Sequence, residues 1–131
     1  NEKFVNASDE LTEIYSQWVQ AHNDKDIDKV LSFETDSITI ALANGNVIKG
    51  SEEHAESLSN YFESNPKWNL YWALPYVGVN NGEEWIIAGQ NVTSTNSDGE
   101  ETVTQIMIDA QFIDGRLNYI IAYDKELQTQ D

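Results

Sequence analysis

The chain of 131 residues is long enough for one domain with a buried core, and its 40% hydrophobic content, with four Trp, six Tyr and four Phe, is that of a globular protein. Its 7 basic and 23 acidic residues give a formal net charge of −16, which disfavours binding to DNA, RNA and anionic membranes. The absence of Cys excludes disulfides and thiolate nucleophiles, and no apolar run reaches the roughly 20 residues of a membrane-spanning helix.

The first part of the chain predicts three helices. In the first, apolar side chains recur at helical spacing, and Ser8 or Asp9 can cap its start. A short second helix is predicted over residues 26–33, and a third over residues 51–64 with Ser51 as its cap. The apolar stripe of the first helix is Leu11, Ile14, Tyr15, Trp18, Val19 and His22. The inward positions of the third helix are drawn from His54, Ala55, Leu58, Tyr61 and Phe62.

A hairpin is predicted between the second and third helices. Ile38, Ile40 and Leu42 alternate with polar or small residues, which is typical of a half-buried strand. The dipeptide Asn44-Gly45 favours a type I′ turn, and a short return strand starts at Val47.

The second half of the chain predicts four long antiparallel strands, separated by turn signals. Pro75 inside the first of them places that strand at a sheet edge or at a bulge, because proline cannot donate a ladder hydrogen bond. The four strands cover residues 67–79, 84–95, 101–113 and 116–124. The expected fold class is α+β: a cone-shaped, curled, mixed or antiparallel sheet wrapped around three N-terminal helices.

The chain is expected to form a single domain over residues 1–131. Residues 1–7 have no periodic pattern and are predicted to be a loose lead-in. The sequence leaves the compartment open between the cytoplasm and export after removal of a signal segment.

Three stretches of the sequence, with helices and strands predicted in this order, resemble the nuclear transport factor 2-like superfamily. This superfamily includes SnoaL-like polyketide cyclases and ketosteroid isomerases. The first, "YSQWVQAHNDKDIDKVLSFETDSITI", is similar to the family's first two helices and first strand. The second and third, "VIKGSEEHAESLSNYF" and "FIDGRLNYIIAYD", are similar to its strand–Gly–helix segment and last hairpin. The resemblance implies a cystatin-like cone with an apolar cavity and, in many members, dimers through the outer sheet face.

Only part of the ketosteroid isomerase site is present at the matching positions of this sequence. The segment Ile40-Ala41-Leu42 has no carboxylate where an isomerase has its aspartate base. Trp18 stands where the enzyme has a tyrosine, and an indole donates a hydrogen bond but does not cycle a proton at neutral pH. Asp109, six residues before Gly115, matches the second acid of the isomerases, which is held protonated so that it can donate a hydrogen bond.

The side chain of Asp109 has two possible directions. Apolarity makes Ile106, Ile108, Ala110 and Phe112 the core face of this strand, so that Asp109 points outward. The family spacing instead places Asp109 in the cavity. Both directions remain open at this point.

Two histidines complete the candidate site. His54 is a candidate proton carrier at a position where the family usually has an aliphatic residue, and the alternative is a partly exposed helix histidine. His22 is favourable near a helix C-terminus because of the helix dipole alone. The spacing of neither histidine matches a metal motif, so no metal and no cofactor are expected. The candidate ligand contacts are Trp18, Tyr15, His22, Gln111, Leu58 and Phe62.

Three hypotheses for function remain. The first is a cone that binds a small apolar or amphipathic ligand. The second is an isomerase, cyclase or dehydratase that uses Asp109 and His54 as acid and base. The third is an association module with a filled core. In each case a symmetric homodimer is expected, because the late strands carry apolar residues on both faces.

Overall fold

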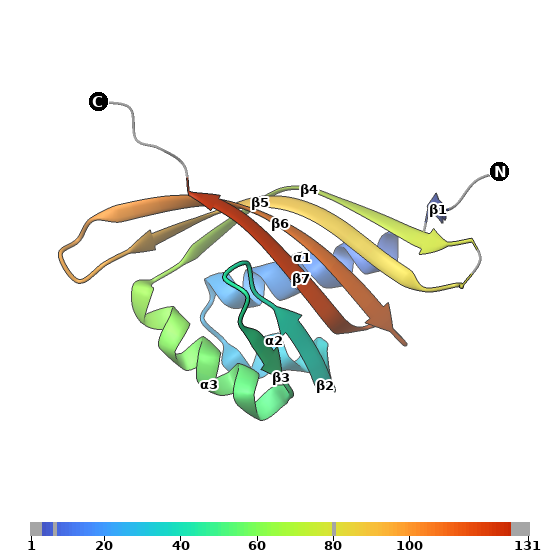
Figure 1. Ribbon diagram of the computed structural model, residues 1–131, viewed down its shortest axis with the longest axis horizontal. Coiled ribbons are helices and arrows are strands. Elements are labelled where there is room, and N and C mark those ends of the chain that lie inside the picture. Colours follow the sequence, from blue (N-terminus) through green and yellow to red (C-terminus); the bar gives the residue numbers. More distant parts are fainter. Residues whose placement is uncertain (1–3, 7, 80, 127–131) are drawn as a thin grey trace.

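The computed structural model describes residues 4–6, 8–79 and 81–126 (Figure 1). The elements in chain order are β1 (Phe4–Asn6), α1 (Asp9–Asn23), α2 (Ile27–Ser32), β2 (Glu34–Ala41), β3 (Val47–Lys49), α3 (Ser51–Tyr61), the 3-10 helix η1 (Phe62–Ser64), β4 (Lys67–Gly78), β5 (Glu84–Thr95), β6 (Glu101–Ile113) and β7 (Arg116–Glu126). Figure 1 shows α1, α2 and α3 on one side of the long strands β4–β7. The α+β class and the three helices are therefore confirmed.

Side chains cap the first two helices. The Ser8 hydroxyl accepts the backbone N–H of Glu10 at the start of α1, which confirms Ser8 rather than Asp9 as the cap. The Asp26 carboxylate accepts the N–H of Lys29 and so begins α2.

The start of α3 differs from the prediction. Its cap is Gly50, whose φ of 87° suits a residue without a side chain. Ser51 is already helical, and its hydroxyl donates to the carbonyl of Asp36 at 3.4 Å. The α-helix also ends at Tyr61, after which η1 tightens the chain before Asn65 turns it with a φ of 48°.

The seven strands form one mixed sheet in the order β1-β4-β5-β6-β7-β2-β3. Strands β4 to β7 are the predicted antiparallel meander, while β2 joins β7 in parallel. Strand β1 pairs with the end of β4, so the prediction of a loose lead-in is wrong for residues 4–6; residues 1–3 and 7 lie outside the described residues.

Pro75 lies where β4 forms the edge of the sheet. Strand β1 pairs only with residues 76–78 of β4, so Pro75 has a ladder partner only on the β5 side. A register shift between Leu70 and Trp72 adds an irregularity to the same strand. Both features agree with the expectation of an edge or a bulge.

The β2–β3 hairpin is present, but its turn type was predicted wrongly. Gly45 has a φ of 93°, while Asn44 has no positive φ, which a type I′ turn requires. The N–H of Gly45 donates to the carbonyl of Leu42 at 3.0 Å, and the N–H of Leu42 donates to the carbonyl of Asn46 at 2.9 Å. This pattern fits a type I turn followed by a glycine that admits positive φ.

The core lies between the helices and the concave face of the sheet. The buried hydrophobic side chains of the sheet are Ile38, Ile40, Ile48, Ile86, Ala88, Val92, Ile108, Ala110, Phe112, Leu117 and Ile120. Those of the helices are Leu11, Tyr15, Trp18, Val19, Ala21, Val30 and Leu58. Within the described ranges, no helix has the length and apolar character needed to cross a membrane.

Candidate functional site: a cavity with a buried glutamate–histidine pair

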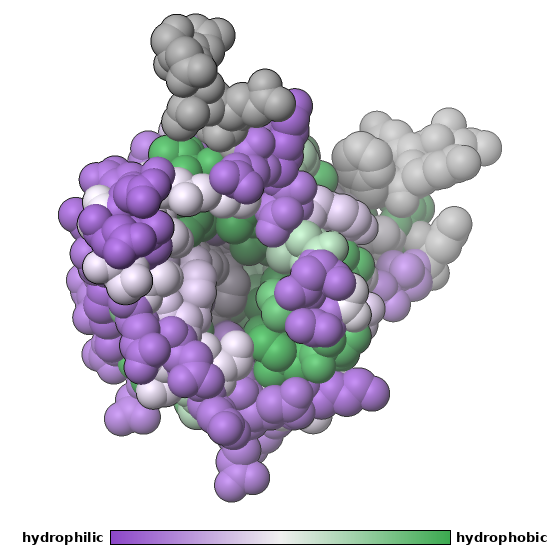
Figure 2. Space-filling view, turned by 60° about the vertical axis from the view of Figure 1, so that its left-hand side comes forward, coloured by the Kyte–Doolittle hydropathy of each residue, from purple (hydrophilic) through white to green (hydrophobic). Residues whose placement is uncertain are grey.

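The side chains between the sheet and the helices leave a cavity of about 300 Å³. Figure 2 shows the hollow, with apolar surface along one side and hydrophilic residues around its rim. It lies within the usual size range of small-molecule sites, which is roughly 300–1,000 Å³. The lining residues are Trp18, His22, Ile40, Leu42, Ala43, Asn44, Ile48, His54, Ser57, Leu58, Tyr61, Trp68, Ile106, Ile108, Ile120, Ala122 and Asp124.

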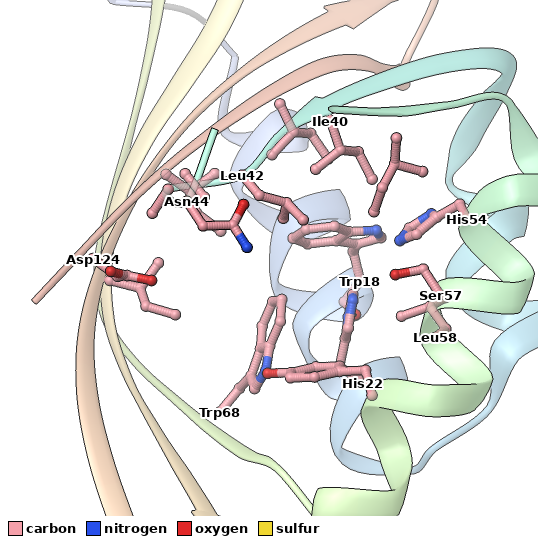
Figure 3. A pocket seen from close by; sticks show the side chains of 17 residues that line it. Trp18, His22, Ile40, Leu42, Asn44, His54, Ser57, Leu58, Trp68 and Asp124 are labelled. Carbon is pink, nitrogen blue, oxygen red and sulfur yellow. The ribbon is translucent and has the colours of Figure 1, made fainter. Parts of the chain in front are cut away.

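The polar groups of the cavity gather at two ends. In Figure 3, His54 and Ser57 of α3 lie at one end, and the Ser57 hydroxyl points into the cavity. Asn44 of the β2–β3 turn and Asp124 of β7 lie at the other end. The walls between these ends are aliphatic and aromatic, so the cavity suits a largely apolar molecule with a polar group.

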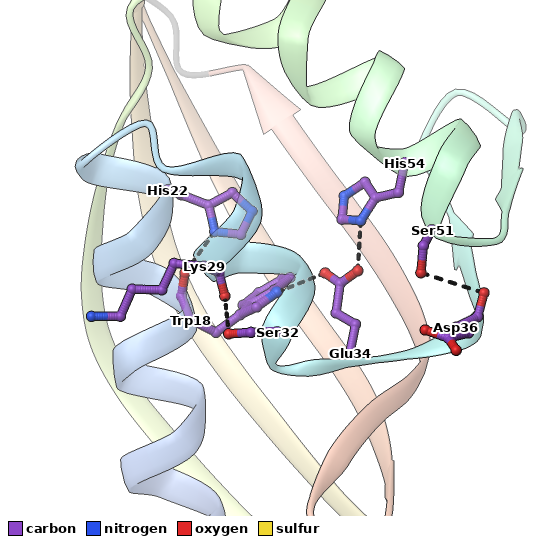
Figure 4. Close-up of polar contacts among 8 residues, drawn as sticks. All are labelled: Trp18, His22, Lys29, Ser32, Glu34, Asp36, Ser51 and His54. Carbon is purple, nitrogen blue, oxygen red and sulfur yellow. Dashed lines mark hydrogen bonds and ion pairs between the residues drawn. The ribbon is translucent and has the colours of Figure 1, made fainter.

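The Glu34 carboxylate joins two of the lining side chains from behind the cavity wall. Its Oε1 atom lies 2.7 Å from His54 Nδ1, and its Oε2 atom accepts the indole N–H of Trp18 at 2.8 Å (Figure 4). The side chains of His54 and Glu34 are only 6% and 0% exposed. A buried carboxylate is costly without hydrogen bonds, and here each oxygen has a partner.

Local structure places these three groups together. His54, Leu58 and Tyr61 follow one another at helical spacing along the side of α3 that lines the cavity. Glu34 is the first residue of β2, and the N–H of Leu117 donates to the carbonyl of Phe33 beside it at 2.8 Å. Strand β2 thus begins against β7, with its first side chain turned toward the helices.

His22 is the second histidine of the cavity, and it is neutral. Its Nδ1 lies 2.7 Å from the carbonyl of Trp18, and its ring stacks on Trp68 with centroids 3.9 Å apart. Burial lowers the pKa of His22 to about 3, against a smaller opposing effect of the hydrogen bond to Trp18, and nearby His54 lowers it further. A carbonyl accepts only from a protonated nitrogen, so Nδ1 carries the proton and Nε2 is an acceptor.

Tyr61 and Trp68 form another polar contact of the wall. The indole N–H of Trp68 donates to the Tyr61 hydroxyl at 2.8 Å. Burial raises the pKa of Tyr61, and the hydrogen bond from Trp68 opposes this only in part. The phenol therefore keeps its own proton at neutral pH.

Of the two directions that the sequence left open for Asp109, the structure has the outward one, so its assignment as the acid of the cavity is wrong. Asp109 is paired across the sheet with Ile87 and Ile121, while its neighbour Ile108 lines the cavity, so Asp109 faces the opposite side of the sheet. The Tyr76 hydroxyl donates to Asp109 Oδ1 at 2.9 Å. Burial first, and then the bond to Asp109 and its charge, raise the pKa of Tyr76. Strand parity, rather than the family spacing, gives the direction of this side chain.

Of the six predicted ligand contacts, Trp18, His22 and Leu58 line the cavity. The other three do not line it. Tyr15 is fully buried in the core, where its hydroxyl donates to Gln90 Oε1 at 2.8 Å.

Gln111 and Phe62 lie elsewhere for different reasons. Gln111 shares the outer face of β6 with Asp109 and accepts a hydrogen bond from Asn118 at 3.4 Å. Phe62 has left α3 for η1, where its ring meets the edge of His22 with centroids 6.3 Å apart.

Glu34 is the most buried of the site residues that the sequence patterns missed, and the lining residues Asn44, Ser57, Trp68 and Asp124 were missed as well. Glu34 precedes the predicted strand, and no motif marks it. The sequence held one signal. Glu34 is an even number of residues away from Ile38 and Ile40, and strand alternation places such side chains on the same face of a sheet. That signal is ambiguous, since Asp36 has the same parity yet is exposed; the sheet register shifts between Glu34 and Thr39.

The described residues contain no group of His, Asp and Glu that could hold a metal ion. The polar side chains that the site offers to a ligand are His22, whose Nε2 is an acceptor, and His54, which is held by a carboxylate. The hydroxyl groups of Ser57 and Tyr61, the Asn44 amide and the Asp124 carboxylate complete the set.

Comparison with known proteins supports the fold. No protein-family model matches the chain, and no curated protein sequence matches it. Among solved structures, the epoxide hydrolase/cyclase-like enzyme SalBIII, described for pyran ring formation in the polyether salinomycin, is similar with a TM-score of 0.77 and 13% identity, over 88% of this chain and 90% of that chain.

Two further solved structures have the same shape. An NTF2-like protein of unknown function from Cytophaga hutchinsonii has a TM-score of 0.66 and 13% identity, over 88% of this chain and 99% of its own. A cystatin-fold protein from Novosphingobium aromaticivorans has a TM-score of 0.68 and 19% identity, over 88% of this chain and 98% of its own. At these identities the similarity shows the fold, and the chain has the nuclear transport factor 2-like, cystatin-type fold.

Proposed function

We propose that the protein binds a small, uncharged, largely apolar molecule in the cavity between the sheet and the helices. The observation that carries this proposal is the cavity of about 300 Å³, with apolar walls between two polar ends. An association module would instead fill this space with side chains.

The walls of the cavity favour an apolar ligand. Most lining residues are aliphatic or aromatic, among them Leu58, Ile108 and Ile120, and transfer of apolar ligand surface from water to such walls contributes about 25 cal/mol per Å². The side chains of Trp68, Tyr61 and Trp18 add aromatic surface against which a flat ligand can pack.

The charges of the site disfavour an anionic ligand. The lining residues, all within the described part of the chain, include no Lys or Arg, while Asp124 contributes a carboxylate at one end. The whole chain carries a formal net charge of −16, which further lowers the affinity for anions. A hydroxyl, carbonyl or amide group matches the neutral His22 and the Ser57 hydroxyl better than a carboxylate does.

A fluorescence titration with 1-aminoanthracene, a neutral aromatic probe, tests this proposal. We expect the emission to increase and shift to shorter wavelength on binding, with saturation at one probe per chain. The variant Ala122→Phe places a ring in the cavity and is expected to abolish saturable binding.

The matched control is Ile121→Phe, one residue earlier on β7. Strand alternation places this side chain on the outer face of the sheet, so binding should persist. Equal loss of binding in both variants, or no saturable binding to the unmodified protein, would contradict the proposal.

A further inference from the structure

We propose that Ser57 is the nucleophile of an acyl-transfer reaction on a small, neutral, apolar ester bound in the cavity. His54 acts as its base, and Glu34 positions His54. This inference rests on the proposed function, because the ester must occupy the same cavity. His54 and Ser57 lie on α3 at one end of the cavity (Figure 3), and Glu34 begins β2 behind the wall.

The Glu34 carboxylate sets the orientation and the tautomer of His54. Its Oε1 accepts from His54 Nδ1 at 2.7 Å, and its Oε2 accepts from the Trp18 indole at 2.8 Å. Because Nδ1 donates, the neutral imidazole has its lone pair on Nε2. This Nε2 has no hydrogen-bond partner within the described residues, so the lone pair is available for general base catalysis.

The Ser57 hydroxyl is free to react with a ligand. The hydroxyls of Ser32 and Ser64 donate to backbone carbonyls three residues earlier, at 2.6 and 2.8 Å. The Ser57 hydroxyl has no such bond and no other hydrogen-bond partner in the part of the chain that the structure describes. It points from α3 into the cavity instead (Figure 3).

Helical spacing brings the hydroxyl and the base together. Ser57 follows His54 by three residues on α3, and side chains three apart on a helix are neighbours, with Cβ atoms about 5–6 Å apart. At this separation the imidazole takes the hydroxyl proton directly or through one water molecule. A hydroxyl, a base and a carboxylate that orients the base are the three groups that activate a serine nucleophile.

The charges of the site favour a neutral ester as substrate and release of its acid product. The apolar walls bind the ester, whereas hydrolysis converts it into a carboxylate. The lining residues, all within the described part of the chain, include no Lys or Arg to hold this anion, and the chain has a formal net charge of −16. The acid is therefore expected to leave the cavity.

The reaction balances with water as the second substrate. The Ser57 oxygen attacks the ester carbonyl carbon while its proton moves to His54 Nε2, and Glu34 stabilises the imidazolium. The bond from the carbonyl carbon to the alcohol oxygen then breaks, and His54 returns the proton to that oxygen. Water attacks the acyl carbon and gives a proton to His54, which passes it to the Ser57 oxygen as the carboxylic acid leaves.

Hydrolysis of p-nitrophenyl butyrate, a neutral ester with a flat ring, tests the proposal. We expect the protein to accelerate release of p-nitrophenolate, followed by absorbance. Saturating 1-aminoanthracene should suppress the acceleration because it occupies the same cavity. Tandem mass spectrometry of acid-quenched, trypsin-digested protein should locate a butyryl group on Ser57.

Variants of α3 identify the reacting groups. Ser57→Ala should lose both the acceleration and the butyryl group. The matched control Ser59→Ala removes an exposed hydroxyl two residues further along α3 and should react like the unmodified protein. Both variants should stay folded, because alanine is the best helix former. His54→Gln should lose about 100-fold or more of the acceleration, the usual contribution of a general base.

Glu34 is a positioning residue, so its test compares reactivity with binding. Glu34→Gln keeps an oxygen that accepts from His54 but lacks the charge that stabilises the imidazolium. We therefore expect a lower maximal rate with unchanged affinity for 1-aminoanthracene. Glu34→Asp keeps the charge and should recover part of the rate. Equal maximal rates in the Gln variant and the unmodified protein would overturn this role.

The outcomes separate this inference from the proposed function. Saturable binding of 1-aminoanthracene together with hydrolysis of saturating p-nitrophenyl butyrate at the buffer rate would overturn the acyl transfer and leave ligand binding intact. Butyryl groups only on residues other than Ser57, or hydrolysis that 1-aminoanthracene does not suppress, would also overturn it. These results come from the unmodified protein and so do not depend on the folding of any variant.

Discussion

The Glu34 carboxylate lies 2.7 Å from His54 Nδ1, and both side chains are buried, with His54 in the cavity wall and Glu34 behind it. The same carboxylate accepts the Trp18 indole N–H, so one side chain from β2 connects α1 with α3. These contacts contribute to stability whether or not a ligand is present.

Replacement of Glu34 should destabilise the protein. Glu34→Ala leaves two buried donors without an acceptor, and each unpaired group costs about 1–3 kcal/mol. Urea unfolding should show a lower free energy of unfolding by the sum of these costs. The control Glu56→Ala removes an exposed carboxylate of α3 and should change stability by about 0.5 kcal/mol or less. A Glu34→Ala variant as stable as this control would contradict the role of the contacts.

His22 should make stability depend on pH. Its pKa is about 3 in the folded protein and about 6.5 in the unfolded chain, so between these values the unfolded state binds a proton that the folded state does not. The free energy of unfolding therefore falls as the pH decreases from about 6.5 toward 3, by up to about 1.4 kcal/mol per pH unit from this group.

The variant His22→Asn isolates this contribution. Its amide N–H can replace Nδ1 as donor to the Trp18 carbonyl, but it does not titrate. Urea unfolding at several pH values between 4 and 7 should give a flatter dependence in the variant, since both proteins share the same carboxylates. Parallel curves would show that His22 is not held neutral.

Tyr15 and Gln90 form an isolated polar pair in the core. Both are 0% exposed, and the Tyr15 hydroxyl donates to Gln90 Oε1 at 2.8 Å. Gln90 Nε2 has no partner within the described residues. Tyr15→Phe should therefore cost about 1–3 kcal/mol, because it leaves a buried carbonyl oxygen unpaired.

The double variant Tyr15→Phe/Gln90→Met should recover stability relative to Tyr15→Phe. It removes both polar groups and also the unpartnered amide, so no buried group of this pair is left to satisfy. Chemical denaturation of both single variants and the double variant gives the coupling energy. Additive effects would contradict the pairing.

We also propose a symmetric homodimer through the outer face of the sheet. Trp72, Leu74, Met107 and Tyr123 are between 39% and 59% exposed, and strand pairing places Met107 between Gly89 and Tyr123 on this face. Monomers rarely expose such a contiguous apolar surface. The carboxylate of Asp109, which lies on the same face, already accepts the Tyr76 hydroxyl.

Sedimentation velocity at micromolar concentration tests the dimer. We expect the unmodified protein to sediment as a dimer and Met107→Glu to sediment as a monomer. Ser59→Glu adds the same charge to an exposed position of α3 and should leave the dimer intact. A monomer in the unmodified protein would refute the proposal.

The sequence predicted the fold better than the site. Helical periodicity and turn residues identified α1, α2, α3 and the four-strand meander, because these patterns are local. The short strand β1 was missed because three residues carry no periodicity, and its pairing with β4 is not local.

Prediction of the site from the sequence depended on the direction of individual side chains. His54 was identified from its helical position, but Glu34 lies 20 residues away and reaches it only because β2 starts beside β7. Asp109 shows the opposite error: its spacing matched a family motif, while the alternation of its strand turned it outward. The spacing of residues along the sequence predicts neither a register shift within a sheet nor a contact between residues far apart in the chain.

Intermolecular NOEs between 1-aminoanthracene and the methyl groups of the protein show whether the cavity is the binding site. If the probe binds between the sheet and the helices, we expect NOEs to Leu58, Ile108 and Ile120, which line the cavity. NOEs confined to Leu74, Ile87 and Ile121, which belong to the opposite face of the sheet, would contradict binding in the cavity.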